Sequence, residues 1–153
     1  MKFLSKKMYI FVAAFIITLD QVVKHYIMQS LPHHQINQFL SIDLVFNRGI
    51  SWGLLHSDNA TVFACVNSAI LFVIGSLIVH SVVRMMQKRC IIGEVMVFAG
   101  AVSNYIDRYY YDGVVDFISL SYLDWHFPVF NIADMFIVMG VMLMLFLQWR
   151  RPS

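Results

Sequence analysis

The chain has 153 residues, of which 59% are hydrophobic and only 13% are charged. A soluble domain of this length cannot bury so much apolar surface, so the composition indicates an integral membrane protein. The formal net charge of +2 is too small to indicate a nucleic-acid partner, and two cysteines are too few for a disulfide framework.

Residues 8–28 form the first apolar segment and predict a retained membrane span. Three lysines precede it in the manner of a signal peptide, namely Lys2, Lys6 and Lys7. No small-residue cleavage site follows, because Asp20 and Gln21 interrupt the apolar run, which then resumes up to Met28. The segment has roughly the 20 residues that a helix needs to cross the hydrocarbon core of a bilayer.

Two charged residues of this span are predicted to pair. Asp20 and Lys24 stand four positions apart, so they share one face of a helix. Either charge alone would be costly near lipid, whereas the pair is tolerated. The pair is either a structural ion pair or one polar wall of a substrate site.

Residues 30–56 are predicted to form an external loop with some strand character. Apolar and polar residues alternate loosely up to Phe46, and Asn47-Arg48-Gly49 has turn chemistry. The apolar residues that follow are predicted to lie on the membrane surface, namely Ile50, Trp52, Leu54 and Leu55. The loop histidines lack any recognisable metal-ligand spacing, so no metal site is predicted at His33, His34 and His56.

Residues 62–83 and 91–109 predict the second and third spans. In the second span, Ser68 and Gly75 lie on one face and permit close helix packing. Glu94, near the start of the third span, is predicted to pair with the basic residues that separate the two spans.

One face of the third span changes character along its length. Gly93 and Gly100 form a second small-residue face. Gly100, Asn104 and Arg108 follow at steps of four, so the same face is predicted to become polar towards its far end.

Residues 110–128 form the second loop and residues 130–149 the fourth span. Aromatic residues in and beside this loop suit a membrane–water interface, namely Tyr109, Tyr110, Tyr111, Tyr122 and Trp125. Eight of the 11 basic residues lie at the two termini or between the second and third spans: Lys2, Lys6, Lys7, Arg84, Lys88, Arg89, Arg150 and Arg151. By the positive-inside rule both termini are cytoplasmic and both loops face outwards.

These segments predict an all-α integral membrane protein with four transmembrane helices. No internal repeat or linker divides the chain, so residues 1–153 are predicted to form a single membrane domain. Asp116 and Asp134 then lie at the outer membrane surface, where the chain leaves the third span and enters the fourth.

The two acids fit the chemistry of a proteolytic pair. The loop between Asp116 and Asp134 can fold back so that the two carboxyls meet. Two carboxylates held close do not both ionise easily, so one of them keeps a proton. The pair would then supply a base that activates water and an acid that protonates a carbonyl oxygen or a leaving amine.

Simpler interpretations stay open at this point. Asn131 and Asp134 match a helix cap and an acid in the first helical turn, which alone explains Asp134. Asp116 could pair with Arg108. A serine–lysine pair would need Lys24, which Asp20 is better placed to hold, and no His-Glu-x-x-His or Gly-x-Ser-x-Gly motif occurs.

Five motifs, in order along nearly the whole chain, resemble those of the bacterial lipoprotein signal peptidases, or type II signal peptidases. The matching segments are Asp20-Gln21-Val22-Val23-Lys24, Asn47-Arg48-Gly49 with Trp52-Gly53, Gly100 with Asn104 to Arg108, Val114-Val115-Asp116-Phe117, and Phe130-Asn131-Ile132-Ala133-Asp134. Each motif alone is weak, whereas five in this order and at these depths are specific.

The resemblance implies an aspartic endopeptidase of the bacterial inner membrane, with a small extracytoplasmic β-cradle and a short surface helix built from the loops. Its substrates would be prolipoproteins whose lipobox cysteine already carries diacylglyceryl, cleaved just before that cysteine. Asp116 and Asp134 match the catalytic pair. Further positions match substrate-binding or supporting residues: Asp20, Lys24, Asn47, Gly49, Gly100, Asn104, Arg108, Val114, Asn131 and Ala133.

The resemblance also implies the partners. These are the signal peptides of diacylglyceryl prolipoproteins, membrane lipid and globomycin-type cyclic peptide inhibitors. No metal, cofactor or nucleic acid is expected, and the chain is expected to act as a monomer.

Two departures from the family pattern concern substrate preference more than catalysis. Ile50, Ser51 and Trp52 stand where the family has small residues and phenylalanine, and Ser103 stands where a glycine usually precedes the asparagine. Two other classes stay open, namely a non-catalytic four-span protein and an inactive relative that binds signal peptides. A transporter would carry its acids near the membrane centre, whereas these acids cluster at one surface.

Overall fold

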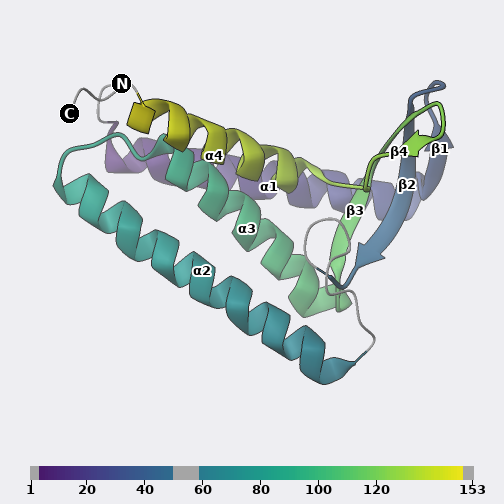
Figure 1. Cartoon of the computed structure of the whole chain (residues 1–153), viewed down its shortest axis with the longest axis horizontal. Coiled ribbons are helices and arrows are strands. Elements are labelled where there is room, and N and C mark those ends of the chain that lie inside the picture. Colours follow the sequence, from purple (N-terminus) through teal and green to yellow (C-terminus); the bar gives the residue numbers. More distant parts are fainter. Residues whose placement is uncertain (1–3, 50–58, 150–153) are drawn as a thin grey trace.

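The structure is a computed structural model that describes residues 4–49 and 59–149. Along the chain it contains α1 (Lys6–Ser30), β1 (His33–Gln35), β2 (Leu40–Asn47), α2 (Ala60–Met86), α3 (Ile92–Tyr111), β3 (Val114–Tyr122), β4 (Trp125–His126) and α4 (Ile132–Trp149). The helices run along the long axis of the molecule, and the strands gather at one end (Figure 1). The four predicted apolar segments are therefore all helical. The residues predicted to lie on the membrane surface, Ile50, Trp52, Leu54 and Leu55, lie outside the described residues. The described parts of the two loops contain no short surface helix.

Helix α3 is the centre of the bundle, because it packs against α4, α1 and α2. Its small-residue face makes the closest approach: a Cβ added at Gly100 would lie 2.6 Å from the carbonyl oxygen of Ala133. One added at Gly93 would lie 2.8 Å from the carbonyl oxygen of Gly140. The predicted role of Gly93 and Gly100 is thus confirmed. The matching prediction for Gly75 is wrong, because a Cβ there would meet nothing within 4 Å.

Three helices, α1, α2 and α4, are long and apolar enough to cross a membrane. Many of their apolar side chains point outwards; Phe11, Phe72 and Val138 are 66%, 76% and 61% exposed. Such surfaces suit lipid and not water. Helix α3 differs in composition, because it carries Glu94, Asp107 and Arg108. Three of the four predicted spans are therefore confirmed by length and composition.

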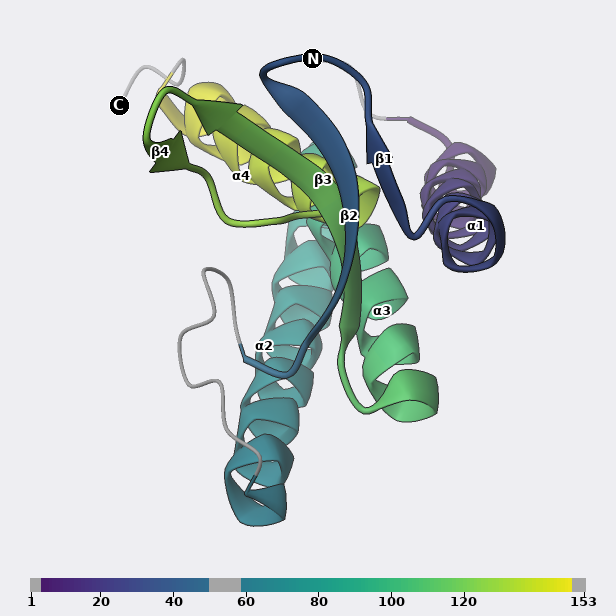
Figure 2. The same ribbon diagram turned by 90° about the vertical axis from the view of Figure 1, so that its right-hand side faces the viewer.

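The strands form one antiparallel sheet in the order β1-β2-β3-β4. This sheet lies across the ends of α1, α3 and α4 (Figure 2). A register shift between Ile42 and Val45 marks a bulge in β2. At the other edge, Phe130 pairs with Ile118 of β3, and the amide of Ile118 donates to the carbonyl of Phe130 at 2.8 Å. The small sheet expected from the loops is confirmed.

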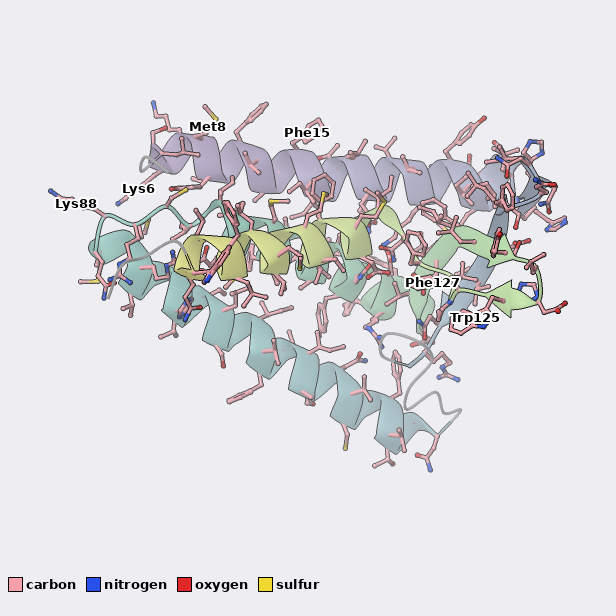
Figure 3. The ribbon with its side chains drawn as sticks, turned by 45° about the horizontal axis from the view of Figure 1, so that its top comes forward. Lys6, Met8, Phe15, Lys88, Trp125 and Phe127 are labelled. Carbon is pink, nitrogen blue, oxygen red and sulfur yellow. The ribbon has the colours of Figure 1, made fainter. Side chains whose placement is uncertain are left out.

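The two ends of the molecule differ in chemistry. Lys6 and Lys88 lie at one end, and Trp125 and Phe127 lie at the other (Figure 3). At the basic end the guanidinium of Arg84 lies 2.7 Å from the carboxylate of Glu94, which confirms the predicted pairing of that acid. The acids Asp116 and Asp134 lie at the aromatic end, where β3 and α4 begin.

Candidate active site

Asp116 and Asp134 line one cavity of about 720 Å³ between α2, α3 and α4, below the sheet. Asp116 is the third residue of β3, and Asp134 lies in the first turn of α4. The pairing of Phe130 with Ile118 holds the start of α4 against β3. This pairing places the two acids in the same site, as the sequence predicted.

Asp116 is buried, and each of its carboxylate oxygens accepts a hydrogen bond. Its side chain accepts from the amide of Asn131 at 2.7 Å and from the amide of Asn47 at 3.0 Å. Burial raises the pKa of Asp116 to about 7, and the negative charge of Asp134 acts in the same direction. Near neutral pH this carboxyl is therefore poised between its acid and its anion.

Asp134 takes part in a reciprocal cap at the start of α4. Its backbone N–H donates to the side chain of Asn131 at 2.9 Å, and the backbone N–H of Asn131 donates to its carboxylate at 3.3 Å. This is the geometry of a capping box, so the helix-cap interpretation is confirmed. The other carboxylate oxygen of Asp134 accepts a hydrogen bond from the side-chain amide of Asn104 at 2.8 Å. Asp134 also lines the cavity. The cap and the site use the same side chain.

The two acids are linked through asparagines. The side chain of Asn131 donates to Asp116, to the carbonyl of Val115 at 3.3 Å and to the side-chain oxygen of Asn104 at 3.0 Å. Asn104 in turn donates to Asp134. The structure thus joins both predicted asparagines to both acids, and no direct Asp116–Asp134 hydrogen bond occurs in the described part of the chain.

Lys24 is the hub of a buried polar cluster. Its ammonium lies 2.7 Å from Asp20 and 2.6 Å from Asp107, and it donates to the side-chain oxygen of Asn104 at 2.9 Å. Lys24, Asp20 and Asp107 are at most 1% exposed. The three acceptors match the three protons of an ammonium. Because Lys24 occupies the oxygen of Asn104, the amide nitrogen of Asn104 faces Asp134.

Asp107 is a supporting residue that the sequence interpretation missed. Besides Lys24 it accepts from Gln21 at 2.8 Å and from the backbone N–H of Val115 at 3.1 Å. It therefore ties α1 and α3 to the strand that carries Asp116. The sequence could have indicated this role, because Asp107 follows Asn104 by three residues and both therefore lie on one side of a helix.

Ser103 is integrated into the same cluster. Its hydroxyl donates to Asp20 at 2.7 Å and accepts from the side chain of Gln21 at 3.1 Å. The other oxygen of Asp20 accepts from the backbone N–H of Ala133 at 2.8 Å. Ser103, which departs from the family pattern, therefore links α3 to α1 through buried hydrogen bonds. The departures at Ile50, Ser51 and Trp52 lie outside the described residues.

Arg108 holds the turn that carries Asn47. It donates to the carbonyls of Arg48, at 3.4 Å, and of Gly49, and its guanidinium lies over the ring of Phe63 at 5.9 Å. The backbone N–H of Gly49 donates to the side chain of Asn47 at 3.0 Å. Among the described residues Arg108 forms no ion pair with Asp116, so that alternative is wrong.

Of the remaining predicted positions, one lines the cavity and two pack α3 against α4. Val114 lines the cavity beside Asn47 and Gly49. Gly100 and Ala133 form the close contact between α3 and α4 that was described above. No group of three or more His, Cys, Asp or Glu residues that could hold a metal occurs within residues 4–49 and 59–149.

The chain is similar in sequence to known proteins over most of its length. Residues 12–150 match the family model described as signal peptidase (SPase) II. The chain is 30% identical to a lipoprotein signal peptidase of Anaplasma phagocytophilum over 143 residues, which cover 90% of this chain and 89% of that protein. It is 33% identical to the Staphylococcus aureus enzyme of the same name over 140 residues, which cover 89% of this chain and 84% of that one.

Solved structures share the fold. A structure described as a bacterial membrane enzyme at 2.3 Å resolution superposes with a TM-score of 0.79 and 26% identity, covering 97% of this chain and 92% of the other. A second bacterial membrane enzyme, at 1.9 Å resolution, superposes with a TM-score of 0.74 and 25% identity, covering 99% and 98%.

Proposed function

The chain belongs to the signal peptidase II family and removes signal peptides from prolipoproteins, and we propose that it does so as an aspartic peptidase whose catalytic pair is Asp116 and Asp134. The observation that carries the proposal is the convergence of both acids, through two shared asparagines, on one cavity. No other pair of acids lines that cavity in the part of the chain that the structure describes.

The environments of the two acids support different roles. Burial raises the pKa of Asp116 to about 7, so we infer that Asp116 carries the proton and acts as the acid. Asp134 accepts hydrogen bonds from Asn104 and from the backbone N–H of Asn131 at the positive end of α4, and we infer that it acts as the base. A water between them loses a proton to Asp134 as its oxygen attacks the scissile carbonyl, whose oxygen takes the proton of Asp116. The resulting diol collapses when the amine leaves with a proton from Asp134 and one diol hydroxyl returns its proton to Asp116, which restores both acids to their starting states.

The supporting residues act by orientation. Lys24 fixes Asn104 so that its amide nitrogen points at Asp134. Asn47 and Asn131 hold the two oxygens of Asp116, and Arg108 fixes the turn that presents Asn47. Each acid is thereby held by groups whose own positions are fixed, as a preorganised site requires.

The walls of the cavity fit a lipid-modified substrate. Side chains of α2 and α4 make its membrane-facing side apolar, including Ile70, Val73, Met135 and Val138. We infer that this side accepts the diacylglyceryl chains and the apolar residues of the signal peptide, and that cleavage falls just before the lipidated cysteine. Globomycin-type cyclic peptides would compete for the same cavity.

We also propose the arrangement in the membrane. Helix α3 also spans the membrane, in addition to the three apolar helices, because it lies inside the bundle that they form. The basic end faces the cytoplasm and the sheet faces outwards from the inner membrane, since basic residues gather at one end and aromatic ones at the other (Figure 3). In a cysteine-free background, Tyr110→Cys should react with a membrane-impermeant thiol reagent in intact cells, and Lys88→Cys should not. Protection of the first and labelling of the second would invert the orientation.

The mechanism is tested by replacing each acid with its amide. Purified Asp116→Asn and Asp134→Asn proteins should each cleave a diacylglyceryl-modified model prolipoprotein about 10²–10⁴-fold more slowly than the parent, with the products detected by mass spectrometry. The double variant should be little worse than either single one, because the acids act as a unit.

Matched controls separate chemistry from folding. Asp112→Asn changes an exposed acid at φ 54°, a conformation that asparagine tolerates, and should keep full activity. Asp107→Asn should lower stability more than turnover. If Asp134→Asn kept near-normal turnover, Asp134 would be a helix cap only and the aspartic mechanism would fail. If both single variants still bound signal peptide and neither the variants nor the parent cleaved it, the chain would be an inactive binder.

A further inference from the structure

A second cavity, of about 400 Å³, lies at the basic end of the molecule, far from the acids. It is formed where α2 ends and α4 ends, and its lining includes His80, Arg84, Gln87 and Arg89 beside the apolar Val83 and Met144. The reaction described above uses none of these residues.

Arg84 is built into this cavity and not merely exposed on it. The residue is 8% exposed, its Nη1 lies 2.7 Å from the carboxylate of Glu94, and its Nη2 donates to the carbonyl of Cys90 at 3.2 Å. Its Nε and both carboxylate oxygens of Glu94 are buried and have no well-aligned hydrogen-bond partner among the described residues. The pair is therefore held by charge, and its polar atoms keep unused hydrogen-bonding capacity, which is costly to bury.

The charges around the cavity leave an excess of positive charge. Glu94 lies 2.7 Å from Arg84, so the charges of these two residues offset each other. Arg89 also lines the cavity and forms no ion pair within residues 4–49 and 59–149, while His80 lies 3.8 Å from Glu94. The cavity therefore offers guanidinium donors, an amide at Gln87 and net positive charge to an anion.

The surroundings select the kind of anion. Lys6 and Lys88 lie at the same end of the molecule as this cavity (Figure 3). By the positive-inside rule, this end lies at the cytoplasmic surface of the membrane. Val83 and Met144 line the cavity, and the neighbouring Val79 and Met86 of α2 are 65% and 78% exposed. Apolar side chains directly beside a cationic cavity suit a ligand with a charged head and acyl chains, as in other basic pockets between membrane helices.

We propose that this cavity binds the phosphate headgroup of an anionic phospholipid, with Arg84 and Arg89 as its donors and the outward faces of α2 and α4 against its acyl chains. Since α2 and α4 also form walls of the larger cavity, a lipid held here fastens the basic ends of the two helices between which the substrate binds. The site is separate from the catalytic pair and stands whether or not the aspartic mechanism holds.

The test compares lipid binding to the purified full-length protein in detergent by native mass spectrometry. Phosphatidylglycerol should bind more tightly than phosphatidylcholine. Arg89→Gln should weaken the phosphatidylglycerol complex about fivefold, the effect of one basic side chain at a membrane surface. Arg84→Gln combined with Glu94→Gln removes the ion pair without leaving a lone buried charge and should weaken it further. Lys7→Gln is the matched control, because Lys7 is an exposed basic residue of the same end that does not line the cavity.

Each outcome decides the proposal. Weaker phosphatidylglycerol binding in Arg89→Gln, with unchanged binding in Lys7→Gln, supports the site, even if the double variant fails to fold. Equal binding of the two lipids, or equal loss in Arg89→Gln and Lys7→Gln, overturns it in favour of general surface charge. Binding of inorganic phosphate that depends on Arg89, together with no phosphatidylglycerol binding that depends on it, would retain an anion site but overturn the lipid as its occupant.

Discussion

Lys24→Met should destabilise the protein strongly while leaving chemistry possible. The ammonium of Lys24 lies 2.7 Å from Asp20 and 2.6 Å from Asp107, and all three side chains are almost completely buried. Removing it leaves two carboxylates together without a cation, and loss of one partner from such a buried pair costs about 3–5 kcal/mol. In a chain of this size each kcal/mol lowers the melting temperature by about 2–4 °C, so a fall of roughly 6–20 °C is expected.

The assay follows unfolding of the detergent-solubilised protein by tryptophan fluorescence, with turnover measured well below the transition. Turnover should fall but persist, because Asn104 loses only one of its orienting partners. The triple variant Lys24→Met, Asp20→Asn, Asp107→Asn removes the uncompensated charges and should recover much of the stability. Lys7→Met, at an exposed lysine of the same helix, should change little. Complete inactivity at an unchanged melting temperature would refute this reasoning and place Lys24 in the reaction itself.

Three further predictions follow from the site and the bundle. Because the acid form of Asp116 is needed and its pKa is raised to about 7, kcat/KM should decline as pH rises through about 7; a rate that instead increased through this range would make Asp116 the base. Gly100→Ala should destabilise by roughly 1–3 kcal/mol, because the new Cβ meets the carbonyl of Ala133 at 2.6 Å. Gly75→Ala, in open space on α2, should stabilise by about 0.5–1 kcal/mol, and equal effects of the two changes in thermal unfolding would contradict the packing described. Ser103→Ala should cost about 1 kcal/mol in the same assay and keep turnover, because Asp20 retains other donors; loss of turnover without loss of stability would assign Ser103 a role in the reaction.

Long apolar segments made the helices predictable from the sequence. Their length and the steps of four from Gly100 to Arg108 depend only on helix geometry. The strands were predictable more loosely, because alternation between Phe39 and Phe46 shows a sheet surface but not its partner. The pairing of β2 with β3, and of Phe130 with Ile118, depends on contacts between distant segments.

The roles of individual polar residues were only partly predictable. Asp20 and Lys24 paired as their spacing indicated, but the second carboxylate at Lys24, that of Asp107, comes from another helix. Spacing cannot show such a contact. Arg108 illustrates the same limit, because an arginine near acids suggests an ion pair, whereas its main partners are backbone carbonyls, which carry no side-chain signal.

The splayed position of α2 bears on how the enzyme should be assayed. Helix α2 packs mainly on α3 and diverges from α1 and α4 (Figure 1), and side chains of α2 and α4 line the larger cavity. If the substrate is anchored by acyl chains, as proposed above, it reaches a cavity with such walls by diffusion in the plane of the bilayer. The concentration that governs its encounter rate is then its mole fraction in the lipid, and dilution with inert lipid at constant bulk concentration should slow cleavage as effectively as removing substrate.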